Sequence, residues 1–97
     1  MAAYLIAEVE VTDPEMYKAY MALTPASIAR HGGRFLVRGG PTEALEGAPP
    51  KRVVVAEFDS LEAARRWYRS VEYTEARAIR SKAAKSRLFL VEGAPPA

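Results

Sequence analysis

The sequence contains no cysteine and only one histidine, His31. Without cysteine the chain can form neither a disulfide framework nor a thiolate site. One histidine and scattered carboxylates also lack the ligand spacing that holds a metal ion, so we expect no metal. The glycine pairs at 32–33 and 39–40 flank a strand instead of opening a helix, which excludes a phosphate-binding loop. We therefore expect neither a metal nor an organic cofactor.

Long hydrophobic runs are also missing, and no stretch is long enough to cross a bilayer. The opening residues 1–7 are apolar, but they have no basic flank and run directly into Glu8 and Glu10. This pattern is typical of a strand and not of a signal peptide. We expect a cytoplasmic protein that does not interact with membranes.

Positive charge is concentrated in one part of the chain, although the formal net charge is only +2. Residues 60–87 contain eight Lys and Arg against three Glu. Such a stretch could bind nucleic acid. However, RNA-binding modules of related layout stack bases on aromatic residues of their inner strands, whereas residues 52–58 offer only Phe58, beside the carboxylate of Glu57. We interpret the basic stretch as a solvated helix face and expect no nucleic-acid partner.

An internal repeat is the most informative feature that is present. Residues 10–15 resemble residues 57–62, each followed by two aromatic residues, and residues 34–39 resemble residues 87–93. Each copy predicts a strand, a capped helix and a strand, so two copies predict an α+β, ferredoxin-like βαββαβ fold. Its four-stranded antiparallel sheet would carry both helices on one face. We expect one domain over residues 1–97, with residues 94–97 as a flexible tail.

The period of two in the predicted strands separates two faces of this sheet. One face is apolar and should receive the helices; it contains Leu5, Ala7, Val9, Val11, Phe35, Val37, Val54, Ala56 and Phe58. The opposite face mixes aliphatic and charged residues: Tyr4, Ile6, Glu8, Glu10, Arg34, Leu36, Arg38, Val53, Val55 and Glu57. We expect a second copy of the chain to cover this mixed face, which would leave a partly apolar cavity between sheet and partner subunit. The helix stripes facing the sheet are predicted to be Met16, Tyr20 and Leu23, and Leu61, Ala64 and Tyr68.

Capping residues predict where the helices begin and end. Asp13 precedes Pro14 at the start of the first helix, and Asp59 with Glu62 forms a capping box at the start of the second. We expect Pro25 to interrupt the first helix, with Thr24 capping a restart that the glycines at 32–33 terminate.

The remaining chain contains one predicted bend and one long connection. The second helix is expected to bend near Ser70 and to continue as far as Ala83. Residues 39–50 connect the two repeats, and residues 42–45 could form a short hairpin arm there.

Several short motifs spread over the chain closely resemble those of domain-of-unknown-function family 1330. They are His31-Gly32-Gly33-Arg34, Val37-Arg38-Gly39-Gly40, Glu46-Gly47, residues 52–58, Ala63-Ala64, Trp67-Tyr68, Ser70, Glu72-Tyr73, Arg80 and Val91-Glu92-Gly93. The similarity runs in unbroken order from Tyr4 to Gly93. It implies a dimeric α/β barrel built from two ferredoxin-like protomers, and it implies no reaction, because this superfold hosts unrelated chemistries. One departure is Val71, where the family's motif usually has proline.

Glu57, Arg38 and His31 are the candidate catalytic residues. Glu57 follows Val53 and Val55 on one strand face, and these aliphatic neighbours would favour its protonated form and suit it to proton transfer. Alternatively, Glu57 is a structural partner of Arg38 or Arg52. Arg38 could hold a substrate carboxylate or simply neutralise Glu57. His31 could act in catalysis or satisfy carbonyl groups at the end of the first helix.

The candidate substrate-binding residues are Arg52, Trp67, Tyr68, Tyr73 and Arg80. Trp67 and Tyr68 are adjacent on a helix, so one should lie in the core and the other should border the cavity. Two hypotheses remain. The chain is a homodimeric small-molecule-binding protein or cofactor-independent enzyme, with a small carboxylate or aromatic ligand; or it is a non-catalytic structural or ligand-binding homodimer.

Overall fold

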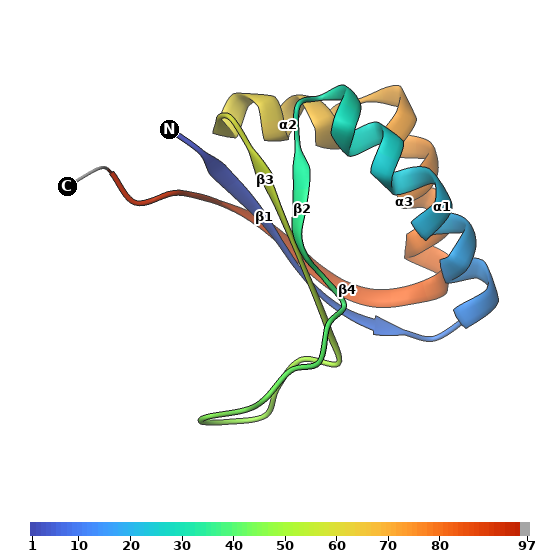
Figure 1. Ribbon diagram of the computed structural model, residues 1–97. Coiled ribbons are helices and arrows are strands. Elements are labelled where there is room, and N and C mark those ends of the chain that lie inside the picture. Colours follow the sequence, from blue (N-terminus) through green and yellow to red (C-terminus); the bar gives the residue numbers. More distant parts are fainter. Residues whose placement is uncertain (96–97) are drawn as a thin grey trace.

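The computed structural model describes residues 1–95. Four strands and three helices follow one another along the chain (Figure 1). They are β1 (Ala3–Val11), α1 (Pro14–Arg30), β2 (Arg34–Arg38), β3 (Arg52–Phe58), α2 (Leu61–Arg69), α3 (Val71–Ala83) and β4 (Ala84–Glu92). The predicted order of strand, helix and strand in each half is confirmed.

The strands form one antiparallel sheet in the order β2-β3-β1-β4. β1 therefore lies between the two strands of the second unit, and β3 lies between the two strands of the first. The helices all lie on one side of this open sheet (Figure 1). This is the ferredoxin-like α+β fold that the repeat predicts. We call the side with the helices the helix face and the other side the open face.

The helix ends follow from local capping, with one correction. Asp13 caps α1 as predicted, because its Oδ1 accepts a hydrogen bond from the backbone N of Met16 at 3.1 Å. In α2 the cap is Ser60 and not Asp59, since the Ser60 hydroxyl accepts from Ala63 N at 3.0 Å. Both residue types cap well, so the sequence could not separate two adjacent candidates.

The predicted bend at Ser70 is a complete break between α2 and α3. The Ser70 hydroxyl donates to the Trp67 carbonyl at 2.6 Å and accepts from Tyr73 N at 3.2 Å, so one side chain ends α2 and starts α3. Val71 then begins α3 with 83% of its surface exposed. The break turns α3 so that it packs beside α1 (Figure 1).

α1 continues through Pro25, so the predicted interruption there is wrong. Thr24 does not cap a new helix; its hydroxyl donates to the carbonyl of Tyr20 at 2.7 Å, one turn back. This hydrogen bond and the packing of α1 against α3 keep the helix in register around the proline.

The buried side of α1 also differs from the predicted stripe. Met16 and Leu23 are exposed, whereas the buried residues are Tyr17, Tyr20, Thr24, Ser27 and Ile28. Thr24 and Ser27 can be buried because their hydroxyls bond to backbone carbonyls of the same helix. The core between sheet and helices is completed by aromatic residues, of which Phe58, Trp67 and Tyr73 have almost no exposed surface.

An irregularity in β2 reverses the predicted faces of its last residues. Phe35 is opposite Ala56, but Val37 is opposite Val55 and Arg38 is opposite Val54, with a register shift between Phe35 and Val37. Because the extra residue changes the alternation, Val37 belongs to the open face and Arg38 to the helix face. The prediction that put Val37 with Phe35, and Arg38 on the opposite face, is wrong.

Residues 39–51 form a long loop that projects from the sheet (Figure 1). It contains no strand, so the hairpin arm suggested for residues 42–45 is not formed. Leu45 is almost fully exposed in this loop. Of the predicted tail, residues 94 and 95 have no regular secondary structure, and residues 96–97 lie outside the described residues.

Candidate functional site

A pocket lies between the helix face of the sheet and helices α1 and α3. Apolar side chains of the central strands and aromatic side chains of α1 line most of it, and three arginines complete it: Arg38 from β2, Arg52 from β3 and Arg80 from α3. The volume of the pocket that the centre of a water molecule can occupy is about 30 Å³. We call this the inner pocket. A ligand larger than a few waters would need some of the lining side chains to move apart.

Arg80 is the most deeply buried of the three arginines, with 9% of its surface exposed. One guanidinium nitrogen, Nη1, donates to the hydroxyl of Ser86 at the start of β4. Its Nε is buried and has no hydrogen-bond partner among the described residues. A buried guanidinium that keeps a free donor is a costly arrangement without a ligand or water.

Arg52 is half-buried and is held by weaker contacts. Its Nη2 donates to the sulfur of Met21 at 3.6 Å, and its guanidinium carbon lies 5.6 Å from the centre of the Tyr17 ring. Its Nε is also buried without a partner in the described part of the chain. The guanidinium passes directly over Gly39, where any Cβ atom would collide with it.

Arg38 is the most exposed of the three and lies toward solvent. Its Nη2 donates to the carbonyl of Met21 at 3.0 Å, and its guanidinium carbon lies 4.6 Å from the centre of the Phe35 ring. Because the strand irregularity brings Arg38 to the helix face, it joins Arg52 and Arg80 at one pocket.

No carboxylate of residues 1–95 lies within 4.0 Å of these three guanidinium groups. The ion pairs of the described chain involve other residues: Lys18 with Glu15, Arg30 with Glu72, Arg34 with Glu57, Arg66 with Glu62 and Arg87 with Glu8. The inner pocket therefore combines an apolar wall with positive charge that no carboxylate of the described residues pairs with. Such a lining suits an anion with an apolar body.

Two tyrosine hydroxyls add a neutral polar group beside Arg80. The hydroxyls of Tyr20 and Tyr73 are 2.8 Å apart, and Tyr20 lines the pocket. Burial is the main cause that raises the pKa of Tyr20, and the neighbouring Tyr73 raises it further. Tyr20 is thus a neutral phenol that can share a hydrogen bond with Tyr73.

Glu57 lies on the open face, and its carboxylate is paired with Arg34 on the neighbouring strand. The predicted partners Arg38 and Arg52 are both on the helix face, so pairing with either is wrong. Only 16% of the Glu57 side chain is exposed. The hydrogen bond that the Tyr4 hydroxyl donates to the Glu57 carboxylate, together with the negative charge of Glu57, raises the pKa of Tyr4, which lies opposite Glu57 on β1.

His31 is separate from both Glu57 and the inner pocket. It ends α1, where its backbone N–H, not its imidazole, donates to the carbonyl of Ile28 at 3.1 Å. The side chain lines a surface groove with Arg65, Arg69 and Glu72, and its Nε2 is buried without a partner in the described residues. The three candidate catalytic residues therefore occupy three different places.

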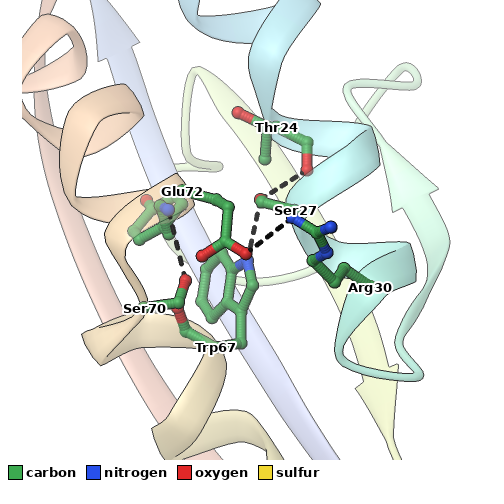
Figure 2. Close-up of polar contacts among 7 residues, drawn as sticks. Thr24, Ser27, Arg30, Trp67, Ser70 and Glu72 are labelled. Carbon is green, nitrogen blue, oxygen red and sulfur yellow. Dashed lines mark hydrogen bonds and ion pairs between the residues drawn. The ribbon is translucent and has the colours of Figure 1, made fainter.

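The candidate aromatic residues are likewise divided. Trp67 is fully buried and donates from Nε1 to the Ser27 hydroxyl at 3.1 Å, as Figure 2 shows. Tyr73 is also buried, with its ring centre 4.0 Å from that of Trp67. Tyr68 is half-buried and lines a shallow pocket beside β4. Trp67 is therefore the core residue of the adjacent pair.

The polar contacts in Figure 2 join α1 to the junction of α2 and α3. Arg30 of α1 pairs with Glu72 of α3 at 3.0 Å. A hydrogen bond from the backbone N–H of Glu72 is the main cause that lowers the pKa of the Glu72 carboxyl group. The hydrogen bond from Arg30 and its positive charge lower this pKa further. Together with the bond from Trp67 to Ser27, this pair fixes the side of α1 that faces the inner pocket.

Sequence reasoning did not identify Met21, Tyr17, Tyr20 or Thr24 as lining residues of the pocket. A signal was present: Pro25 inside a long helix frees a carbonyl group one turn earlier, and such a group needs a partner.

Among the described residues, no helix is long and apolar enough to span a membrane. Within residues 1–95 no three His, Asp or Glu side chains come together as a metal site.

Residues 2–94 match the model of the family described as "domain of unknown function (DUF1330)". The chain belongs to this family. No curated protein matches the DUF1330 chain.

Solved structures of other proteins share the fold. A protein of unknown function from Rhodopseudomonas palustris aligns with a TM-score of 0.78 and 24% identity, over 98% of this chain and 84% of that one. SnoaB, a cofactor-independent oxygenase from Streptomyces nogalater, aligns with a TM-score of 0.67 and 16% identity, over 98% and 95% of the two chains. A dimeric ferredoxin-like protein of unknown function from Thermobifida fusca aligns with a TM-score of 0.58 and 16% identity, over 94% and 90%. At these identities the likeness concerns the fold alone.

Proposed function

We propose that this DUF1330 protein is a single-domain homodimer that binds a small carboxylate with an apolar or aromatic body in the inner pocket. One observation carries the proposal: three arginines line an apolar pocket that receives no carboxylate from residues 1–95. The site differs from the sequence-based expectation, which put the cavity on the open face. Of the predicted residues it retains Arg38, Arg52 and Arg80.

The charge of the pocket favours an anion over a neutral ligand. Arg80 and Arg52 each keep a buried Nε donor without a partner in the described chain. Hydrogen bonds to charged groups are about twice as strong as neutral ones, and a carboxylate can accept two from one guanidinium. A bound carboxylate would supply both the missing acceptors and the missing negative charge.

The open face supports the homodimer. Exposed Val37, Phe89 and Val91 lie there beside half-buried Ile6 and Val55. Solved relatives of this fold include one described as dimeric. A second copy would remove these side chains from water, which small domains often need for stability. A cytoplasmic location is part of the proposal, and cell fractionation tests it.

The proposal has two versions, which differ in whether the bound carboxylate reacts. As an enzyme without cofactor, the protein would use its arginines to stabilise negative charge that develops on the substrate, with the neutral Tyr20 hydroxyl as a hydrogen-bond donor. As a non-catalytic homodimer, it would bind the carboxylate unchanged. The second version is favoured because Glu57, the predicted proton-transfer residue, is paired with Arg34 on the open face and does not line the inner pocket.

Thermal unfolding with benzoate and benzamide tests the binding proposal. The two ligands have nearly the same shape, but only benzoate carries a charge. We expect benzoate alone to raise the midpoint of unfolding in a saturable way, by several degrees at about 100 times its dissociation constant. Arg80→Gln should abolish the shift, and Arg77→Gln, whose arginine lies over Tyr68 outside the inner pocket, should retain it. An equal shift with benzamide, or none with either ligand or with small aliphatic carboxylates, would contradict the proposal.

A further inference from the structure

Pro25 lies inside α1, four residues after Met21. In a regular helix the backbone N–H of residue 25 would donate to the carbonyl of residue 21. Proline has no N–H, and its ring crowds the carbonyl one turn before it and turns that carbonyl away from the helix axis. Pro25 therefore leaves the Met21 carbonyl without its regular helical donor.

Arg38 supplies the missing donor. Its Nη2 lies 3.0 Å from the carbonyl oxygen of Met21, across the space between α1 and β2. The side chain of the same methionine accepts from Arg52, whose Nη2 lies 3.6 Å from the sulfur. Met21 thus contacts two of the three arginines of the inner pocket, one through its backbone and one through its side chain.

We infer that Pro25 is a positioning residue of the inner pocket: by freeing the Met21 carbonyl, it fixes the guanidinium of Arg38 at the mouth. The consequence for ligand binding rests on the proposed function, whereas the placement of Arg38 does not. Apart from its contact with the Phe35 ring, Arg38 is exposed and has no carboxylate partner among residues 1–95, so without the Met21 carbonyl its side chain would sample more rotamers. A fixed guanidinium loses less freedom when a carboxylate binds.

The position of the proline argues against a purely local role. Proline is the least favourable residue in a helix interior, and an alanine here would restore a backbone hydrogen bond. The same chain also contains Pro14 at the first position of α1, where the missing N–H has no helical acceptor and costs nothing. Pro14 is therefore a matched control on the same helix.

Nitrogen-15 NMR of the arginine side chains tests the inference without a ligand. In the wild type, the Nη protons of Arg38 should give a separate, slowly exchanging signal at low temperature, because the bond to Met21 slows rotation of the guanidinium. Pro25→Ala should remove this signal, because residue 25 then competes for the carbonyl and draws it back toward the helix axis. Pro14→Ala should retain it. Pro25→Ser, which also restores the N–H, provides a second variant.

Binding of benzoate to the same variants supplies the functional readout. Pro25→Ala should weaken benzoate binding about tenfold, the effect of losing roughly one charge-assisted hydrogen bond or its preorganisation. In the NMR experiment, Met21→Leu removes the sulfur but retains the backbone carbonyl. This variant should therefore alter the side-chain signal of Arg52 and leave the signal of Arg38 unchanged.

The outcomes separate this inference from the proposed function. An unchanged Arg38 signal in both Pro25 variants overturns the inference, whatever the ligand does. A signal that depends on Pro25 in a protein that binds no carboxylate supports the positioning role and contradicts the proposed function. A lost signal with undiminished benzoate affinity shows that Arg38 placement does not serve binding, which overturns the functional part of the inference.

Discussion

The two faces of the sheet both contain charged residues, but they differ in whether these charges form ion pairs. On the open face two acids have a basic partner on the neighbouring strand: Glu57 contacts Arg34, and Glu8 contacts Arg87. Aliphatic side chains lie between these pairs. On the helix face Arg38, Arg52 and Arg80 border one pocket, and no carboxylate of residues 1–95 pairs with them.

This difference indicates what each face is suited to contact. Charges that are already paired can be buried against another protein surface at lower cost than single charges. The open face is therefore compatible with a second copy of the chain. Guanidinium groups without an acid partner gain most from an anion that arrives from outside. The open face thus suits the proposed partner copy, and the helix face suits the proposed small ligand.

The largest expected effect comes from a single charge on the open face. Val55 lies opposite Ile6 on one side and Val37 on the other. Val55→Arg would bury a charge without a partner in the proposed dimer, which costs several kcal/mol, so the variant should be monomeric or unfolded. Light scattering and urea unfolding measure this. Val71→Arg, at a residue that is 83% exposed on α3, should behave as wild type. A wild-type chain that stays monomeric at micromolar concentration would contradict the dimer.

A smaller effect is expected from breaking one pair on the same face. Glu57→Gln retains the shape of the side chain but leaves Arg34 without its charge partner. Arg34 is 68% exposed in the single chain, so we expect a loss of about 2 kcal/mol in the proposed dimer, below that of a fully buried pair.

The exposed pair of Glu62 and Arg66 provides the control. Glu62→Gln should change the free energy of unfolding by less than about 0.5 kcal/mol. Urea unfolding of both variants gives the comparison. If Glu57→Gln were as neutral as Glu62→Gln while removing an activity, Glu57 would be a proton-transfer residue and its structural role would be refuted.

The sequence was sufficient for the architecture because repetition and capping are local signals. Asp13 with Pro14, the change of direction near Ser70 and the alternation along β1 each depend on neighbouring residues, and the structure confirms them, although the bend near Ser70 is a complete break. The exposed Met16 and Leu23 show the limit of this reasoning. A helix of this composition has more than one possible buried stripe, and the aromatic packing against α3 selects Tyr17 and Tyr20.

The candidate site was predicted less well, because one extra residue in β2 decides which face Arg38 occupies. A strand irregularity has no clear signature in a stretch as short as residues 34–38. Arg38 and Glu57 were therefore expected together and are found on opposite faces. Arg52 and Arg80 were also named as candidates from the sequence, but their meeting at one pocket depends on long-range packing of α3 against α1.

The smallest expected effect concerns a glycine that gives Arg52 its place on the helix face. Gly39 has a φ of +74° and lies directly beneath the Arg52 guanidinium, whereas Gly47 has a φ of +72° and no neighbouring atom within 4 Å. Alanine at either position should cost about 1 kcal/mol of stability, because a side chain is strained at positive φ. Only Gly39→Ala should also displace Arg52 and weaken benzoate binding severalfold, as measured by calorimetry. Since the two variants share the backbone strain, their difference in affinity isolates the position of Arg52. Equal affinities would mean that Arg52 does not contact the ligand, and the anion site would then reduce to Arg38 and Arg80.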